Sequence, residues 1–148
     1  MKTECIFKKE DFESSDGMLT YVWGPSLWHF LHTMSFNYPV KPSCNEKKYY
    51  IQFINSLENI LPCKYCRDNL KRNLKETGFS IKKLKNRNTF SKYIYDLHNH
   101  INKMLNKNTK ISYKEVRNRY ENFRSRCSEK QKVKHFKSKK IVLGKNNK

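Results

Sequence analysis

Two cysteines, Cys63 and Cys66, are the residues whose type and spacing most clearly predict chemistry. A C-x-x-C pair can close a disulfide within one helical turn, and at a helix start the backbone dipole stabilises a thiolate. Pro62 favours a helix start here, because proline is tolerated in the first helical turn. The same spacing supplies half of a zinc site, which needs two further ligands. The motif alone leaves redox chemistry and zinc binding open.

Two further pairs of side chains are predicted to face the protein interior. Trp28 and His32 are one helical turn apart on one stripe, and His98 and Asn102 are one turn apart on another. A single inward histidine is more often a satisfied core residue than a ligand. Beside a C-x-x-C pair, however, these rings and carboxamides suit a flat heteroaromatic cofactor better than zinc. Zinc ligation by His98 and His100 together is awkward, because residues two apart on a helix point to different faces.

Apolar residues at helical spacing predict the elements that position these side chains. The expected helices begin at Pro25, at the capping box of residues 43–46, at Pro62, near Phe90, and at the capping box of residues 112–115. No stretch shows the period-two alternation of a strand. The predicted fold is therefore all-α, a four-helix bundle with a short fifth helix across it.

The composition indicates one domain with a basic C-terminal tail. The chain has 148 residues, with 32 Lys and Arg against 13 Asp and Glu, and a formal net charge of +19. We expect a flexible N-terminal arm at 1–20, the folded domain at 21–125, and a basic, disordered tail at 126–148 that catalysis does not need. The charge of the tail suits either solubility or binding to an acidic partner or nucleic acid.

The sequence also indicates a compartment. No run approaches the ~18 apolar residues of a membrane span, and the first residues lack the apolar core of a signal peptide. We therefore expect synthesis in a cytosol-like compartment and no transmembrane segment. Five cysteines there favour catalysis or metal binding over a passive disulfide framework.

Three motifs together resemble a known family. They are Trp28-x-x-Leu31-His32, Pro62-Cys63-x-x-Cys66, and Leu97-His98-Asn99-x-Ile101-Asn102-x-x-Leu105-x-Lys107. Their order and spacing resemble the Erv/ALR flavin-linked sulfhydryl oxidases over residues 21–125. The segment Trp23-Gly24-Pro25 resembles the corresponding segment in the branch of that family that large DNA viruses encode.

The resemblance implies a helical bundle that binds FAD beside the Cys63–Cys66 disulfide. Cys66 would be the flavin-side sulfur and Cys63 the sulfur that meets the incoming thiol. Lys107 would lie near the phosphates, and Tyr120 would stack on the adenine where the family commonly has tryptophan. The FAD-binding residues that it implies are Trp28, His32, Tyr95, His98, Asn99, Asn102, Lys107, Arg119 and Tyr120.

Some positions depart from the family pattern. Leu61 replaces a tyrosine frequent before the Pro-Cys, and Pro25 replaces an arginine that offers one phosphate contact. Lys75 and Tyr95 stand where cellular members carry a structural cysteine pair, so that disulfide is absent.

The implied activity is oxidation of protein thiols to disulfides, with electrons passing to FAD and then to oxygen to give hydrogen peroxide. The implied partners are a thioredoxin-like or small dithiol protein and a second copy of the chain in a homodimer. The compartment would be host cytoplasm or virion for a viral protein, and the mitochondrial intermembrane space for a cellular one. The alternative, a zinc-stabilised basic helical module that binds nucleic acid, leaves the inward stripes without a role.

In the family that the chain resembles, many members carry a second cysteine pair on a flexible arm, which collects electrons and passes them to the pair beside the flavin. The arms of this chain hold only Cys5 and Cys127. A lone thiol cannot store two electrons as an intramolecular disulfide, so we expect direct exchange between Cys63 and the substrate. Pairing of Cys5 with Cys127, or between two subunits, stays open.

Overall fold

Helices are the only regular elements in the computed structural model, which describes residues 6–107 and 110–125. The helices are α1 (Lys9–Glu13), α2 (Thr20–Asn37), α3 (Cys44–Ile60), α4 (Lys64–Glu76), the 3-10 helix η1 (Ile81–Leu84), α5 (Arg87–Met104) and α6 (Tyr113–Glu121). Within the described ranges, the only β pairing is one isolated bridge, between Gly17 and Cys63. The predicted all-α class is confirmed.

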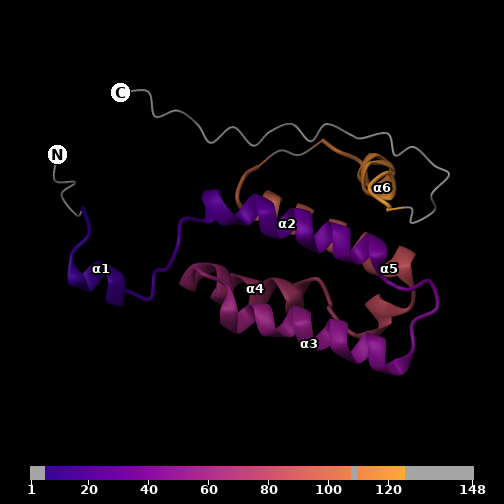
Figure 1. The fold of residues 1–148 in the computed structure, drawn as a ribbon, viewed down its shortest axis with the longest axis horizontal. Helices are drawn as coiled ribbons and strands as arrows, with labels where there is room; N and C mark the ends of the chain where they lie inside the picture. The colour runs from indigo at the N-terminus through magenta and orange to yellow at the C-terminus, as the bar shows by residue number, and fades with distance from the viewer. Residues whose placement is uncertain (1–5, 108–109, 126–148) are drawn as a thin grey trace.

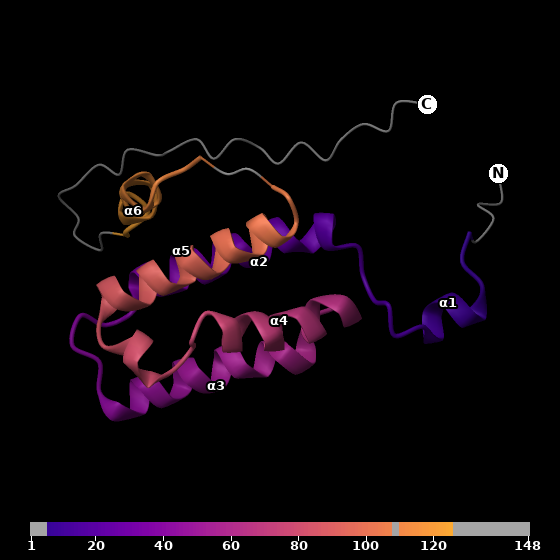
Figure 2. The same cartoon turned by 180° about the vertical axis from the view of Figure 1, so that it is seen from behind.

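The four long helices pack in two layers (Figures 1 and 2). Helix α2 packs on α5, α3 packs on α4, and the contact between α4 and α5 joins the layers. The short helix α6 packs on α2 and α5 and is seen almost end-on in Figure 1, so it crosses them. This arrangement is the predicted four-helix bundle with a short helix across it.

The core lies between these layers and around η1. Its most buried apolar side chains are less than 2% exposed: Tyr38, Ile54, Leu84, Phe90, Ile94 and Leu97. The Tyr38 hydroxyl donates to the Leu84 carbonyl oxygen at 3.0 Å, and the Arg87 guanidinium donates to the Tyr38 carbonyl at 2.5 Å. These bonds join the end of α2 to η1 and to the start of α5.

Helix ends follow the local signals in several places. Ser43 and Glu46 form the predicted capping box of α3, and Ser112 and Glu115 form that of α6. Gly78, just after α4, has φ of 65°, the left-handed conformation expected of a glycine that ends a helix.

Two predicted helix starts are wrong. Helix α2 begins at Thr20, so Pro25 lies inside it and cannot donate the backbone hydrogen bond of an ordinary residue. Helix α4 begins at Lys64 after Pro62, and Cys63 is its N-cap. The Sγ of Cys63 accepts the backbone N–H of Cys66 at 3.2 Å, a role that serine or aspartate usually fills.

The N-terminal segment carries structure that periodicity did not indicate. Residues 9–13 form α1, and residues 16–18 pair with residues 62–64 through the Gly17–Cys63 bridge. The expectations for the basic tail and for Cys5 and Cys127 lie outside the described residues. None of the helices in the described ranges has the length and hydropathy to cross a membrane.

Candidate active site

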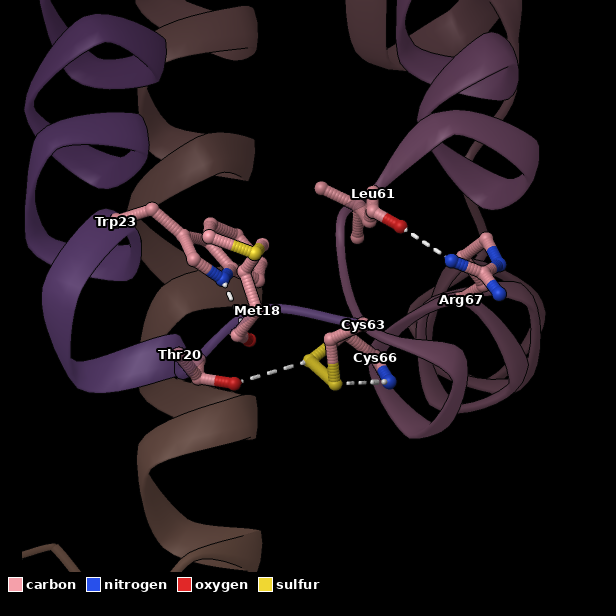
Figure 3. The surroundings of a disulfide bond; sticks show 7 residues. All are labelled: Met18, Thr20, Trp23, Leu61, Cys63, Cys66 and Arg67. Atoms are coloured by element: carbon pink, nitrogen blue, oxygen red, sulfur yellow. Dashed lines mark hydrogen bonds between the residues drawn. A yellow bond between two sulfur atoms is a disulfide. The ribbon is translucent and has the colours of Figure 1, made fainter. Parts of the chain in front are cut away.

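Cys63 and Cys66 form a disulfide at the junction of α3 and α4, with their Cα atoms 5.2 Å apart (Figure 3). The Arg67 guanidinium donates to the carbonyl oxygen of Leu61 at 2.6 Å and so holds the turn that carries the pair. The two sulfurs are bonded to each other, as a redox pair requires. In the part of the chain that the structure describes, no three His, Cys, Asp or Glu side chains group as metal ligands.

The two sulfurs differ in their surroundings. Cys63 is only 9% exposed, whereas Cys66 is partly exposed. The resemblance implied that Cys63 meets the incoming thiol, but in this conformation the Gly17 bridge covers its backbone. The segment that contains Gly17 therefore lies against the backbone of the residue that the resemblance assigns to thiol exchange.

A cavity of about 930 Å³ lies beside the disulfide and between the two helical layers. Its volume is that of a cofactor or small-molecule site. Both cysteines line it, and α2, α3, α4, α5 and α6 all contribute side chains. Most of the wall is apolar or aromatic, including Leu31, Ile54, Leu57, Leu70, Leu97 and Ile101.

Two histidines pair on the wall of this cavity. The His32 Nε2 and His98 Nδ1 atoms are 3.0 Å apart, so one nitrogen donates a hydrogen bond and the other accepts it. The His98 ring also stacks on Trp28, with ring centres 3.9 Å apart and planes 4° from parallel. The other nitrogen of His32, Nδ1, is buried without a protein partner.

Burial keeps both histidines neutral. It lowers the pKa of His32 to about 4, with smaller contributions from neighbouring His98 and His29. Burial also lowers the pKa of His98 to about 4, and the positive charge of Lys107 adds to the effect. At neutral pH the pair is therefore an uncharged, aromatic part of the cavity wall.

Tyr120 reaches the same cavity from α6. Its ring lies 5.2 Å from His32 and 5.6 Å from Phe36, centre to centre. Its hydroxyl is 3.2 Å from Nδ1 of His29. This network connects the short crossing helix to α2.

The structure brings most of the predicted site residues together. The cavity is lined by Trp28, His32, Cys63, Cys66, His98, Asn102, Lys107 and Tyr120. Tyr95, Asn99 and Arg119 are not among its lining residues. The Tyr95 hydroxyl instead donates to the Ile111 carbonyl at 2.9 Å, and Arg119 is exposed on α6.

Sequence reasoning missed several cavity residues. Asn73 is 1% exposed and neither side-chain atom of its carboxamide has a protein partner. It follows Cys66 by seven residues, so helical spacing could have identified it. Thr20, whose hydroxyl lies 3.4 Å from Sγ of Cys66, belongs to a segment predicted to be outside the domain. No local signal identifies it.

The neutral histidine pair predicts a fall in stability as the pH drops. The unfolded histidines bind protons near pH 6.5, whereas the folded ones do so only near about 4. Their contribution is thus complete above pH 6.5 and is lost between 6.5 and 4. Denaturant midpoints should fall between about pH 6.5 and 5, above the range in which carboxylates protonate. The double variant His32→Gln/His98→Gln should flatten this fall; an unchanged slope would contradict the assignment.

Comparisons with known proteins identify the family of this chain. The model of the Erv1 / Alr family matches residues 25–121, so the chain belongs to that family. A protein of Acanthamoeba polyphaga mimivirus, described as a probable FAD-linked sulfhydryl oxidase, is 34% identical over 80 residues. That alignment covers 54% of this chain and only 56% of the mimivirus protein.

Other relatives cover more of the chain. An FAD-linked sulfhydryl oxidase of African swine fever virus (isolate Pig/Kenya/KEN-50/1950) is 34% identical over 67% of this chain and 80% of its own length. The crystal structure of the FAD-binding domain of Erv1 from Saccharomyces cerevisiae superposes with a TM-score of 0.62 at 26% identity, over 70% of this chain and 94% of the yeast domain. The Erv1 core, at 23% identity and a TM-score of 0.64, supports the fold alone and covers 84% of this chain and 98% of that structure.

Proposed function

We propose that the protein is an FAD-dependent sulfhydryl oxidase that forms disulfide bonds in protein substrates. One observation carries the proposal: the Cys63–Cys66 disulfide lines the same cavity as Trp28 and the His32–His98 pair. A redox-active disulfide at the wall of a cofactor-sized cavity can pass electrons to a ring bound there. Family membership and the names of the relatives agree with this chemistry.

The cavity fits FAD in size and in its chemical character. Apolar walls and the Trp28–His98 stack suit a flat ring system. Nδ1 of His32 and the carboxamide of Asn73 are buried polar groups without protein partners, as a site for a polar heterocycle requires. Lys107 supplies a positive charge at the cavity wall for phosphate groups.

The residues proposed to hold FAD thus divide into two groups. Those that line the cavity are Trp28, His32, His98, Asn102, Lys107 and Tyr120. Tyr95, Asn99 and Arg119 are proposed on the resemblance alone.

The thiol chemistry takes place at the disulfide. A substrate thiolate attacks Sγ of Cys63, the Cys63–Cys66 bond breaks, and Cys66 leaves as a thiolate. A second substrate thiolate then displaces Cys63, so the substrate becomes a disulfide and the enzyme pair holds two electrons. The backbone N–H of Cys66, which already donates to Sγ of Cys63, stabilises charge on that sulfur. FAD in the cavity supplies a two-electron acceptor that oxygen can reoxidise, with hydrogen peroxide as the product.

The substrate is proposed to be a thioredoxin-like or small dithiol protein, whose paired thiols can complete both exchange steps. The compartment is proposed to be host cytoplasm or virion for a viral protein, and the mitochondrial intermembrane space for a cellular one. The relatives include both viral proteins and a mitochondrial oxidase of yeast. The nucleic-acid alternative receives no support, because the family match accounts for the same helices and cysteines.

The protein is proposed to act as a homodimer through the outer faces of α2 and α3. Phe30 is 51% exposed, and its ring lies 6.0 Å from that of Phe53 on α3. An exposed aromatic ring that packs on a partly buried one is typical of an interface between copies. Phe30→Glu should produce a monomer in sedimentation analysis, whereas Tyr65→Glu, at an exposed site on α4, should not. A dimer that survives Phe30→Glu would rule out this face.

The proposed activity has a direct test. Purified protein should be yellow, with flavin absorbance near ~450 nm. It should consume oxygen when dithiothreitol is added. Protein that binds no flavin after incubation with FAD, or that consumes no oxygen, would contradict the proposal.

A further inference from the structure

The segment of residues 16–20 is tied by its backbone to the turn that carries the redox disulfide. The Met18 N–H donates to the Pro62 carbonyl oxygen at 2.6 Å, and the Lys64 N–H donates to the Asp16 carbonyl oxygen at 3.4 Å. These two bonds connect parts of the chain more than 40 residues apart. They fix the register of the segment on the turn.

The segment can cross this close to the turn that carries the disulfide because residue 17 is a glycine. Gly17 has φ of 80°, and a Cβ atom there would lie 2.5 Å from the Pro62 carbonyl oxygen. Any side chain would therefore force the segment away from Cys63, the bridge partner of Gly17. The close approach of this segment to the turn therefore depends on glycine at position 17.

This arrangement places the side chain of Thr20 beside the sulfur of Cys66 (Figure 3). The Oγ1 of Thr20 is 3.4 Å from Sγ of Cys66. A disulfide sulfur carries no hydrogen, so the hydroxyl is the donor. The Trp23 indole N–H donates to the Met18 carbonyl at 3.0 Å, which holds the start of α2 on the same segment.

Each sulfur of the disulfide therefore has its own donor. The backbone N–H of Cys66 donates to Sγ of Cys63, a contact made within one helical turn. The hydroxyl of Thr20 donates to Sγ of Cys66 from a different element. The second contact depends on the fold rather than on the C-x-x-C motif.

We propose that Thr20 is a further catalytic residue, whose hydroxyl stabilises the Cys66 thiolate released during thiol exchange. This inference rests on the proposed function. When a substrate thiolate bonds to Sγ of Cys63, the electron pair of the broken disulfide stays on Sγ of Cys66. The proton remains on Thr20, and its hydrogen bond strengthens because the acceptor is now charged. A less basic thiolate is a faster leaving group, so the first exchange step is accelerated.

The test measures ionisation of Cys66 in the full chain, incubated with FAD. A Cys63→Ser background leaves Cys66 as a free thiol that cannot close the disulfide. The rate of its alkylation by iodoacetamide is followed against pH, with mass spectrometry of the peptide that contains it. Thr20→Val removes the hydroxyl and keeps the shape of the side chain, and Thr20→Ser restores a hydroxyl.

Thr20→Val should raise the pH midpoint of Cys66 alkylation by roughly one unit, as expected for loss of one hydrogen bond to a charged group. Thr20→Ser should keep the midpoint of the parent. An unchanged midpoint in Thr20→Val would overturn the inference, and so would an equal shift in both variants, because the hydroxyl would then not be the cause. Alkylation does not require turnover, so failure of the thiol oxidase proposal appears separately, as a lack of oxygen uptake by the unmutated protein.

Discussion

Cys66→Ser should lower oxygen consumption with dithiothreitol by at least ~10³-fold, the scale seen when a covalent catalytic group is removed. Without Sγ of Cys66 the disulfide cannot form, so no two-electron carrier links the substrate to the cavity. FAD should stay bound, because most side chains that line the cavity come from other helices. The measurement pairs an oxygen electrode with the flavin absorbance of the purified variant.

Cys44→Ser is the matched control for this variant. Cys44 is a free, exposed cysteine at the start of α3, remote in sequence from the C-x-x-C pair. Its replacement should leave both oxygen consumption and flavin content unchanged. Turnover by Cys66→Ser at the rate of the unmutated protein would show that electrons bypass the disulfide.

His98→Ala should weaken FAD binding by about 10- to 100-fold, which reflects the loss of one aromatic stack and one hydrogen bond. The variant removes the ring that stacks on Trp28 and the nitrogen that pairs with His32. Both ring nitrogens of His32 would then lack partners, so the cavity wall would lose its fixed arrangement. Titration of the apoprotein with FAD, followed by quenching of flavin fluorescence, gives the dissociation constant.

His100→Ala separates this effect from a general loss of helix α5. His100 lies two residues further along the same helix, at the surface, where Nε2 is 3.1 Å from a carboxylate oxygen of Glu76. Surface contacts of this kind contribute little to stability. FAD affinity should therefore be unchanged in His100→Ala. If His98→Ala bound FAD as tightly as the unmutated protein, the histidine pair would not be part of the FAD site.

Local signals predicted much of the fold. The capping boxes at Ser43 and Ser112 form as predicted, because each depends on residues only three positions apart. The stripes on α2 and α5 also predicted that His32 and His98 face inward. Their direct contact could not be predicted, since it joins residues 66 apart in sequence.

The residue at which α2 begins could not be predicted from sequence periodicity. Pro25 is a good first-turn residue locally, yet the helix begins at Thr20. The backbone hydrogen bond from Met18 to Pro62 holds the extended segment on the turn just before the helix begins. A tertiary contact thus overrides the local preference, and it also creates the Thr20 contact with Cys66.

Rapid mixing of the FAD-loaded protein with dithiothreitol under anaerobic conditions shows whether substrate electrons reach the flavin through the disulfide. Flavin absorbance should be lost in the unmutated protein and should persist in the Cys63→Ser/Cys66→Ser double variant. Cys63 and Cys66 would then be the route by which substrate electrons reach the cavity. Equally fast loss of flavin absorbance in the double variant would contradict the account, because dithiothreitol would be reducing the flavin without the disulfide.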